Sequence, residues 1–376
     1  MPLSLTLPAR INILGNPADA VEGDFATISA AIDCYAGARV DAADAIVLER
    51  LRRDAGGFVC EHREELARDA FPHPYTERLD LAKGALNRLY AASAEFRTKV
   101  AARGMRLGLW TDVPRQSGLG GSSLLVLLTL TAARAHYALD PRLHNDYWLA
   151  ELAQRVEEKE LGIVCGFADR YVPLFGGIGY LDYHGKLHHN PIGQEPYVTY
   201  ERLDPWVEGL PLVAVSTGIA RDSGDVHGVM RARYMEEHAI WVVSGGEAPP
   251  MIEFMRGAWE AAWRGKIALL RGELDIFGEM MNLNHRLVNA MMGYCSFTEG
   301  AGWANNHLID VAHAAGALGA KLTGAGGGGS VFALTRPGEE DLLADAWQQA
   351  AADIGLEQAH VFIPRIVHRG LVIDQD

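Results

Sequence analysis

Apolar and polar residues follow two rhythms along the chain, and each rhythm predicts a different kind of element. Short apolar or alternating segments bounded by glycine, asparagine or proline predict strands over residues 38–60, 105–113, 211–218, 319–324, 330–335 and 360–367. Apolar residues three or four positions apart, the period of a helix face, predict helices over residues 76–103, 122–138, 146–160, 225–243, 250–292 and 303–316. A hairpin is predicted around His184 and Gly185. The chain therefore mixes helices and strands.

The domain organisation follows from the length and from one polar stretch. A chain of 376 residues suggests two domains, at roughly 150 residues for each. The stretch near residues 191–210 is polar and rich in proline, and it separates the first group of predicted elements from a buried strand and long helices. We therefore expect an N-terminal domain over residues 1–200 and a C-terminal domain over residues 201–376.

The composition and charge exclude several classes of protein. Hydrophobic residues make up 49% of the chain and charged residues 22%, which is typical of a globular protein. With a net charge of −14, the chain has no general positive field for nucleic acid or for an anionic membrane. Anionic small molecules can still bind where positive groups are concentrated. The most apolar stretch, residues 124–133, is far shorter than the ~20 residues of a membrane span.

The N-terminus and the cysteines indicate a cellular compartment. The first residues lack the basic segment and long apolar run of a signal peptide. The cysteines lie far apart and form no C-x-x-C motif, which is typical of reduced thiols; they are Cys34, Cys60, Cys165 and Cys295. We therefore expect a cytoplasmic protein.

A glycine run near the C-terminus, LTGAGGGGSVFAL, raises the question of a dinucleotide site. Gly324, Gly326 and Gly329 spell G-x-G-x-x-G, but that fingerprint needs a helix after the glycines to hold the pyrophosphate. Here SVFALT follows, which is β-branched and apolar, and Pro337 comes soon after. The segment therefore predicts strand, glycine loop, strand. Two interpretations remain: a flexible hairpin, or a loop that lets the backbone approach a ligand closely.

A second glycine loop, PRQSGLGGSSLLVLLTL over residues 114–130, precedes an apolar helix. Its glycines allow a tight backbone path, and Ser122 and Ser123 follow where an N-cap is expected. Unpaired N–H groups and the helix dipole make such a terminus a phosphate site, and a serine hydroxyl there can reach a phosphate-bound Mg²⁺. A plain capped helix after a glycine turn is the structural alternative.

Two acidic residues and one arginine supply the remaining parts of a phosphoryl-transfer site. Glu157 and Asp169 flank a glycine-containing turn, and Asp169 sits among apolar residues where a carboxylate needs a partner. One carboxylate could hold Mg²⁺ while the other accepts a proton from a hydroxyl. Arg10 is the candidate cation for developing charge, although an arginine at a strand end can also pair with any surface carboxylate.

Three segments in this order resemble the motifs of the GHMP kinase family, which includes galactokinase, homoserine kinase, mevalonate kinase and phosphomevalonate kinase. They are LPARINILGNPAD at residues 7–19, PRQSGLGGSSLL at 114–125 and GAKLTGAGGGGSVFAL at 319–334. Within the family, GNPAD, ELGIVCGFADRYVPLFGG and ARDSGDVHGVMRARY resemble glucuronokinase-type sugar-acid kinases. The resemblance implies an α+β kinase of two domains, with a ribosomal S5-like N-terminal domain and a ferredoxin-like C-terminal domain.

The resemblance implies catalytic roles for the matching residues. Asp169 resembles the catalytic aspartate that accepts the proton of the sugar hydroxyl. Arg10 resembles the cation that polarises that hydroxyl and stabilises the transferring phosphoryl group. Ser122 and Glu157 match the Mg²⁺ ligands. Because the second motif departs from the usual pattern of the family, Ser123 remains an alternative to Ser122.

The resemblance also implies how ATP and the acceptor are bound. The second motif would line the triphosphate and the third would close over the active site, through Gly118, Leu119, Gly120, Gly121, Ser122 and Ser123 and through Gly324, Gly326 and Gly327. Asp19 matches a ligand of sugar hydroxyls. Arg170 and Arg221 are candidates for an acceptor carboxylate, because arginine binds carboxylates in a bidentate manner. Internal ion pairs are the alternative for both arginines.

The implied reaction transfers the γ-phosphoryl group of Mg-ATP to a small-molecule hydroxyl. For a glucuronokinase-like enzyme the acceptor is the anomeric hydroxyl of a uronic acid. Other acceptors of the family, namely neutral aldoses such as galactose or fucose, heptose phosphates and mevalonate, are alternatives. A sugar sensor that has lost catalysis is a further alternative from a different class. The oligomeric state is left open.

Overall fold

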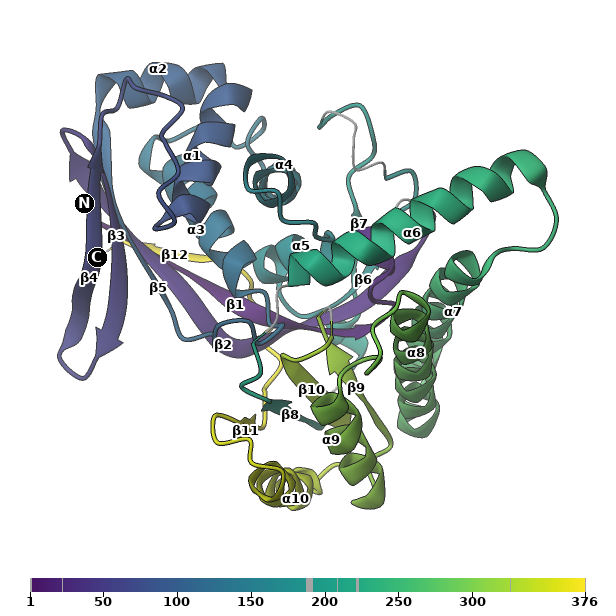
Figure 1. Cartoon of the computed structure of the whole chain (residues 1–376). Helices are drawn as coiled ribbons and strands as arrows, with labels where there is room; N and C mark the ends of the chain where they lie inside the picture. Colours follow the sequence, from purple (N-terminus) through teal and green to yellow (C-terminus); the bar gives the residue numbers. More distant parts are fainter. Residues whose placement is uncertain are drawn as a thin grey trace.

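The computed structural model describes residues 2–21, 23–186, 192–207, 209–220, 223–324 and 326–375, without the side chain of Ser223. Within these residues the strands form a larger and a smaller sheet, and helices pack against both (Figure 1). The predicted α+β class is therefore confirmed. No helix in the described ranges has the length and apolar character to cross a membrane.

The larger sheet has the strand order β12-β1-β2-β5-β3-β4, with β6 paired to β2 and β7 paired to β6. Its described pairs are antiparallel except for β3 with β5. The first part of β2 pairs with β6 and the second part with β5, so this strand joins the two wings of the sheet. The bounds are β1 Leu3–Leu14, β2 Ala26–Ala43, β3 Ile46–Asp54, β4 Gly57–Leu66, β5 Gly104–Thr111, β6 Ile178–Asp182, β7 Thr199–Arg202 and β12 Val372–Gln375.

Helices α1 to α5 lie together on one face of this sheet (Figure 1). Their bounds are α1 Asp80–Ala92, α2 Ala94–Ala102, α3 Gly121–His136, α4 Asp146–Arg155 and α5 Ala168–Phe175, and the short helices η1 Ala18–Ala20, η2 Val156–Glu160 and η3 Asp204–Trp206 link other elements. Helix α3 contacts β1, β2 and β5 as well as α1, α4 and α5. It is therefore apolar on every side, as expected for a helix that is covered all round.

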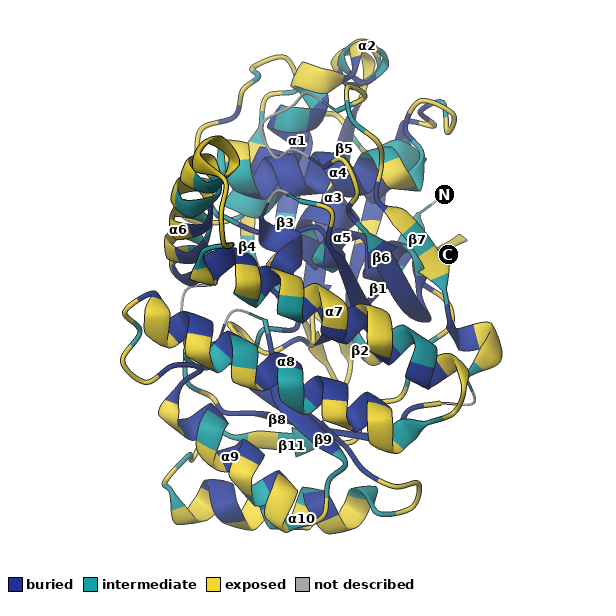
Figure 2. Ribbon diagram, turned by 90° about the vertical axis from the view of Figure 1, so that its right-hand side faces the viewer, coloured by how far each residue is buried: buried dark blue, intermediate teal, exposed yellow. Residues whose placement is uncertain are grey.

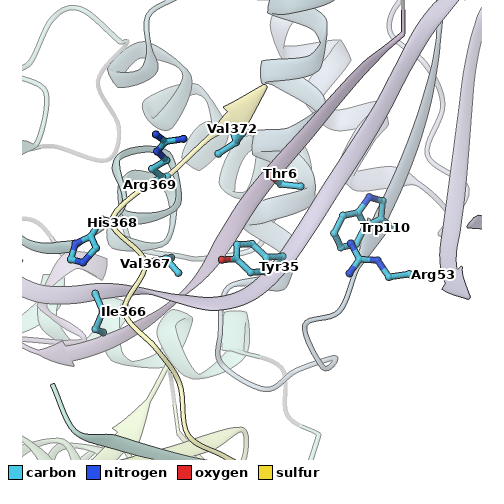
Figure 3. A pocket seen from close by; sticks show the side chains of 10 residues that line it. Thr6, Tyr35, Arg53, Trp110, Ile366, Val367, His368, Arg369 and Val372 are labelled. Atoms are coloured by element: carbon cyan, nitrogen blue, oxygen red, sulfur yellow. The ribbon is translucent and has the colours of Figure 1, made fainter. Parts of the chain in front are cut away.

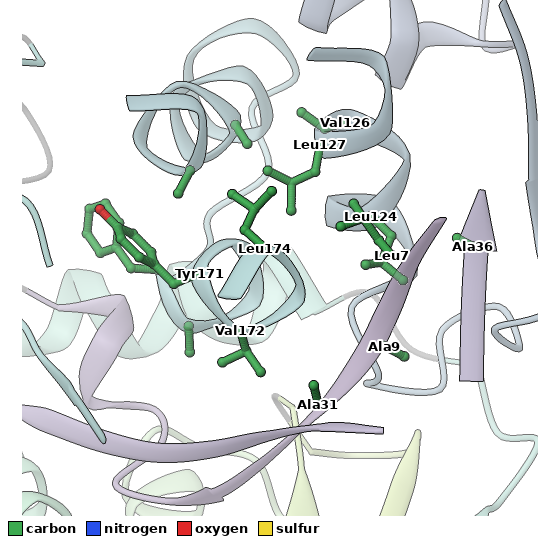
Figure 4. Packing of buried hydrophobic residues seen from close by; sticks show 14 of the residues in the cluster. Leu7, Ala9, Ala31, Ala36, Leu124, Val126, Leu127, Tyr171, Val172 and Leu174 are labelled. Atoms are coloured by element: carbon green, nitrogen blue, oxygen red, sulfur yellow. The ribbon is translucent and has the colours of Figure 1, made fainter. Parts of the chain in front are cut away.

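The buried core between α3, α5 and β1 sets the position of the first turns of α3 and α5, which carry polar residues. Leu124 and Leu127 of α3 belong to one buried cluster with Leu7 of β1 and Val172 and Leu174 of α5 (Figure 4). Burial of each such leucine or valine stabilises the fold by about 1.5–3 kcal/mol. Because these contacts join three elements, they hold the first turns of α3 and α5 in a set position relative to β1.

The smaller sheet has the order β11-β8-β10-β9 and is antiparallel throughout. Strands β9 and β10 flank the glycine run of the third motif, which confirms the predicted order of strand, glycine loop and strand. Helices α7 and α8 lie side by side, with buried residues on one side and exposed residues on the other (Figure 2). The bounds are β8 Leu212–Ser216, β9 Gly319–Thr323, β10 Ser330–Leu334, β11 His360–Phe362, α6 Ser223–Ser244, α7 Pro250–Leu270, α8 Leu274–Tyr294, α9 Trp303–Ala314 and α10 Glu340–Asp353.

Several predicted elements are divided or displaced. The helical periodicity of residues 76–103 is confirmed, but the stretch holds two helices, because Ser93 is extended and its hydroxyl caps α2. The prediction that residues 250–292 are mainly helical is also confirmed, and Gly272, with a φ of +70°, separates the two helices found there. The hairpin predicted around His184 is wrong in its partner: β6 pairs with β7, and residues 187–191 lie outside the described residues.

The end of the chain returns to the first sheet. After β11 the backbone runs back and forms β12, which pairs with β1 from Leu3 opposite Gln375 to Thr6 opposite Val372. The sequence pattern predicted no strand here. The division at residue 200 stays a prediction, and β12 is a C-terminal segment that completes the sheet of the N-terminal half.

Candidate active site

The two glycine loops and the first motif meet at one cavity of about 470 Å³. It is lined by most of the predicted residues, namely Arg10, Asp19, Gly118, Gly120, Gly121, Ser122, Ser123, Glu157, Asp169, Arg170, Gly324 and Gly326. Leu119 is buried instead, and Gly327 donates its N–H to the carbonyl of Ala301. Arg221 lies outside the described residues.

A second cavity, of about 670 Å³, lies where residues 366–372 cross β1 and β2 (Figure 3). Tyr35 and Trp110 form part of its wall, and Arg53 stacks over the Trp110 ring at 4.0 Å. Its lining residues include neither a carboxylate nor any predicted site residue. We therefore place the candidate chemistry in the first cavity.

The two glycine loops touch through their backbones. Gly118 has a φ of +73°, and a Cβ atom there would lie 2.7 Å from the carbonyl oxygen of Thr323. Gly324 has a φ of +80°, and its Cβ atom would lie 3.0 Å from the Cα of Gly118. Only glycine fits both the left-handed backbone and the close approach. The glycine run of the third motif is thus held against the second glycine loop, and both line the cavity.

The start of α3 differs from the prediction in one detail. The N-cap residue is Gly120, in a left-handed conformation, so the helix begins at Gly121 and the prediction of Ser122 or Ser123 as N-cap is wrong. Within the described residues, no acceptor takes the N–H groups of Gly121, Ser122 or Ser123. Free N–H groups at a helix start, together with the helix dipole, attract phosphate.

Both serine hydroxyls are directed to Glu157. Ser122 Oγ donates to Glu157 Oε1 at 2.7 Å, and Ser123 Oγ donates to Glu157 Oε2 at 2.9 Å. Ser122 is exposed while Ser123 and Glu157 are buried. Glu157 lies in the π-helical turn η2, a feature that is frequent at functional sites. A serine and a carboxylate oxygen beside a phosphate site form a donor set that fits Mg²⁺.

Asp169 and Arg10 form a close ion pair in the cavity. Arg10 Nε donates to Asp169 Oδ1 at 2.6 Å, and its Nη2 pairs with Asp169 Oδ2. The third guanidinium nitrogen of Arg10, Nη1, donates to the carbonyl of Gly118 in the second glycine loop. Burial alone would raise the pKa of Asp169, but Arg10 and Arg170 hold that pKa well below its ordinary value. Asp169 is therefore ionised at neutral pH and can only accept hydrogen bonds.

Asp19 joins the first motif to the start of α5. Its Oδ2 accepts hydrogen bonds from the backbone N–H groups of Phe167 and Ala168, each at 3.1 Å. A Cβ atom at Gly166 would lie 2.1 Å from the same oxygen, so glycine is required there. Burial and the neighbouring Asp169 raise the pKa of Asp19. Asp19 thus positions the turn that presents Asp169 and also lines the cavity.

Arg170 is held inside the protein. Its guanidinium pairs with Glu157, donates to the carbonyl of Gly166 at 2.7 Å and lies 3.7 Å from Asp169. Of the two roles that the sequence left open for Arg170, this geometry favours the internal ion pair. The arginine then serves to orient Glu157 and to lower the pKa of Asp169.

Sequence reasoning missed a buried lysine that joins the first and third motifs. Lys321 is fully buried and donates to Asn16 Oδ1 at 2.7 Å, to the Leu322 carbonyl at 2.8 Å and to the Asn12 carbonyl at 3.3 Å. Burial lowers its pKa to about 7. Asn12 in turn donates to Asp169 at 3.4 Å. A lysine within an apolar strand, as in GAKLT, was the signal that could have indicated this role.

A histidine of α6 was also missed. His227 lines the same cavity, and its ring Nδ1 is buried without a hydrogen-bond partner in the described structure. It lies in the segment ARDSGDVHGVMRARY, in which Arg221 was the one candidate site residue. A single histidine inside a helical pattern gives no signal of the direction in which it points.

Comparisons with known proteins relate both halves of the chain to one family. Residues 80–177 match the family model of the GHMP kinases N terminal domain, and residues 266–353 match that of the GHMP kinases C terminal domain. Glucuronokinase 1 of Arabidopsis thaliana is 27% identical over 91% of this chain and 88% of its own length. Mevalonate kinase of Pyrococcus abyssi is 29% identical over 72% and 69%. The structure of Lactococcus lactis galactokinase complexed with galactose superposes with a TM-score of 0.74 and 20% identity, covering 99% and 95% of the two chains.

Proposed function

The chain belongs to the GHMP kinases, enzymes that take ATP as phosphate donor, and we propose that its acceptor is the anomeric hydroxyl of a uronic acid. The proposal for the acceptor rests on the similarity to a glucuronokinase over nine tenths of the chain. The observation that carries the catalytic part is the cavity that unites both glycine loops, Glu157 and the pair of Asp169 with Arg10.

The donor end of the cavity is built for a triphosphate. The N–H groups at the start of α3 and the glycine loops supply donors without side chains in the way. Ser122 and Glu157 would hold Mg²⁺, with Ser123 buried behind them. When bound, Mg²⁺ supplies positive charge against the phosphate oxygens. Arg170 keeps the Glu157 carboxylate oriented for this role.

The acceptor end holds the proton-accepting group. As the anomeric oxygen forms its bond to the γ-phosphorus and the bond between that phosphorus and the bridging oxygen of ADP breaks, the hydroxyl proton passes to Asp169. A carboxylate with a lowered pKa is a weak base, so it acts chiefly by orienting the hydroxyl and taking the proton late. Arg10 bridges Asp169 and the Gly118 carbonyl, which sets its charge between donor and acceptor.

A catalytic role is favoured over a sugar sensor. A sensor that has lost catalysis would be expected to lack the proton-accepting carboxylate or one of the phosphate loops. Here Asp169, Arg10 and both loops line one cavity. The similarity to a mevalonate kinase over 72% of the chain keeps other acceptors of the family within the test.

The test is ATP consumption with Mg²⁺ across glucuronate, galacturonate, galactose, glucose, fucose, a heptose phosphate and mevalonate. We expect turnover with a uronic acid, a sugar 1-phosphate as the product by ³¹P NMR, and loss of turnover in Asp169→Asn. The variant should still bind ATP, seen as a rise in melting temperature. Turnover with a neutral sugar or mevalonate, and none with either uronate, would refute the assignment of the acceptor.

A further inference from the structure

His227 is held in a fixed position with an unpaired ring nitrogen. Its neighbours Val226 and Met230 are buried in the second core cluster, so the backbone of α6 is packed at this point. The ring lines the cavity, yet Nδ1 makes no hydrogen bond. A buried polar atom without a partner costs about 1–3 kcal/mol. Such an atom at the wall of a binding cavity indicates that a ligand supplies the partner.

Arg231 places His227 at the acceptor end of the cavity. Residues four apart share one face of a helix, so His227 and Arg231 lie on the same face of α6. Arg231 binds the loops that carry Asp19 and Asp169. Its Nε donates to the Ala20 carbonyl at 2.6 Å, its Nη2 donates to the Cys165 carbonyl at 2.8 Å, and its Nη1 pairs with Glu158 at 3.0 Å. Ala20 follows Asp19, and Cys165 precedes the turn to Asp169.

The imidazole is neutral at neutral pH. Burial lowers the pKa of His227 to about 4, and Arg231, Arg170 and Arg10 act in the same direction while Asp169 opposes them. A neutral ring carries one N–H donor and one acceptor nitrogen. His227 therefore adds a hydrogen-bond donor beside Asp169 without competing for the pairing of Asp169 with Arg10.

The arginines around His227 already have partners. Arg10 is paired with Asp169, Arg170 with Glu157, and Arg231 with Glu158. A carboxylate that enters this part of the cavity needs a donor that is not engaged in an ion pair. Among the described residues that line the cavity, three have a buried side-chain atom without a hydrogen-bond partner, namely Arg170 Nε, Ser117 Oγ and His227 Nδ1. Arg170 is already engaged in its ion pair with Glu157, and Ser117 belongs to the second glycine loop at the donor end, so His227 is the candidate at the acceptor end.

Resting on a uronic acid as acceptor, we propose that His227 binds the acceptor carboxylate through a ring N–H and thereby sets the preference for a uronate over the corresponding aldose. The interaction places the carboxylate at α6 and leaves the anomeric hydroxyl toward Asp169. Arg231 is then a positioning residue, which holds the α6 face that carries the histidine.

The experiment measures kcat/KM for glucuronate and for glucose in the unmodified enzyme, in His227→Leu and in His227→Gln. We expect His227→Leu to lower kcat/KM for glucuronate about ten- to a hundredfold, the range for losing one hydrogen bond to a charged group. The KM for ATP and the value for glucose should stay within about twofold. His227→Gln keeps an N–H donor and should recover part of the loss.

His238→Leu is the matched control. His238 lies on the same helix, its ring stacks on Tyr234, and it does not line the cavity. This variant should keep the preference for glucuronate. If the unmodified enzyme phosphorylates glucuronate and His227→Leu keeps the full preference, the inference fails while the proposed function stands. An equal loss for both sugars would also overturn it. If the unmodified enzyme phosphorylates no uronate, the proposed function fails and the inference falls with it.

Discussion

The buried Lys321 leads to a prediction about stability against pH. Its ammonium group has three oxygen partners but no carboxylate partner among the described residues. Burial lowers its pKa to about 7 from an ordinary value of 10.5. Between these two values the unfolded chain keeps the proton and the folded chain releases it. The free energy of unfolding must therefore rise with pH in this window, because the unfolded state binds more protons.

The magnitude follows from the pKa difference. One pH unit with a full proton difference changes the free energy of unfolding by about 1.4 kcal/mol. Starting at the folded pKa near 7, the rise between pH 7 and pH 9 is roughly 2 kcal/mol. Burial, and to a smaller extent the charge of Lys321, lowers the pKa of His285 to about 4, so His285 does not titrate in this window.

Urea denaturation of the unmodified protein and of Lys321→Met at pH 7, 8 and 9 tests this reasoning. The difference between the two proteins should change by roughly 2 kcal/mol across the series, because every other titrating group cancels in the comparison. Lys321→Gln serves as a second variant if the methionine protein does not fold. A difference that stays constant from pH 7 to pH 9 would show that the folded lysine keeps its proton, and the argument would be refuted.

Three further predictions concern the active site. Arg10→Gln should raise the pKa of Asp169 and move the acid limb of the kcat profile to higher pH, which a pH–rate series measures, while an unmoved limb would contradict the pairing. Gly324→Ala should raise the KM for ATP about five- to thirtyfold through strain of about 1–2 kcal/mol and contact with the second loop, whereas Gly338→Ala, at a φ of +88° with open space around it, should leave that KM unchanged. Ser122→Ala should raise the Mg²⁺ concentration for half-maximal activity about tenfold, because an exposed hydroxyl oxygen is lost from the donor set; Ser123→Ala should instead lower the melting temperature, and the reverse pattern would exchange their roles.

The sequence predicted the long helices and the glycine loops well, because both depend on local patterns. The apolar run of α3 placed the glycine loop before it, and the β-branched residues of β10 placed the glycine run between β9 and β10. The start of α3 was misassigned because the pattern does not show that Gly120 takes a positive φ. Strand β12 was missed because its partner, β1, lies more than 350 residues away along the chain, and such pairing has no local signal.

The site was predictable only where a motif carried it. The cavity collects Arg10 from the first motif, Asp169 from the segment ELGIVCGFADRYVPLFGG, and Glu157, which lies three residues before that segment. Whether Arg170 pairs inside the protein or faces a ligand depends on the distance to Glu157, which spacing along the chain does not give. His227 lies in a helix whose pattern is the same whether the residue points to solvent or to a cavity, and the signal for Lys321 was its position within the apolar strand β9.

The pairing of β12 with β1 has a consequence for how the chain is synthesised. Strand β1 ends at Leu14 and β12 begins at Val372, so the ribosome must add more than 350 residues before the outer edge of β1 gains its partner. At about 5–20 residues per second, this takes roughly 20 to 70 seconds. During that interval the nascent protein carries an open strand edge, which can pair with other chains. We therefore expect chaperones to shield the open edge of β1 in the newly made protein until β12 has emerged from the ribosome.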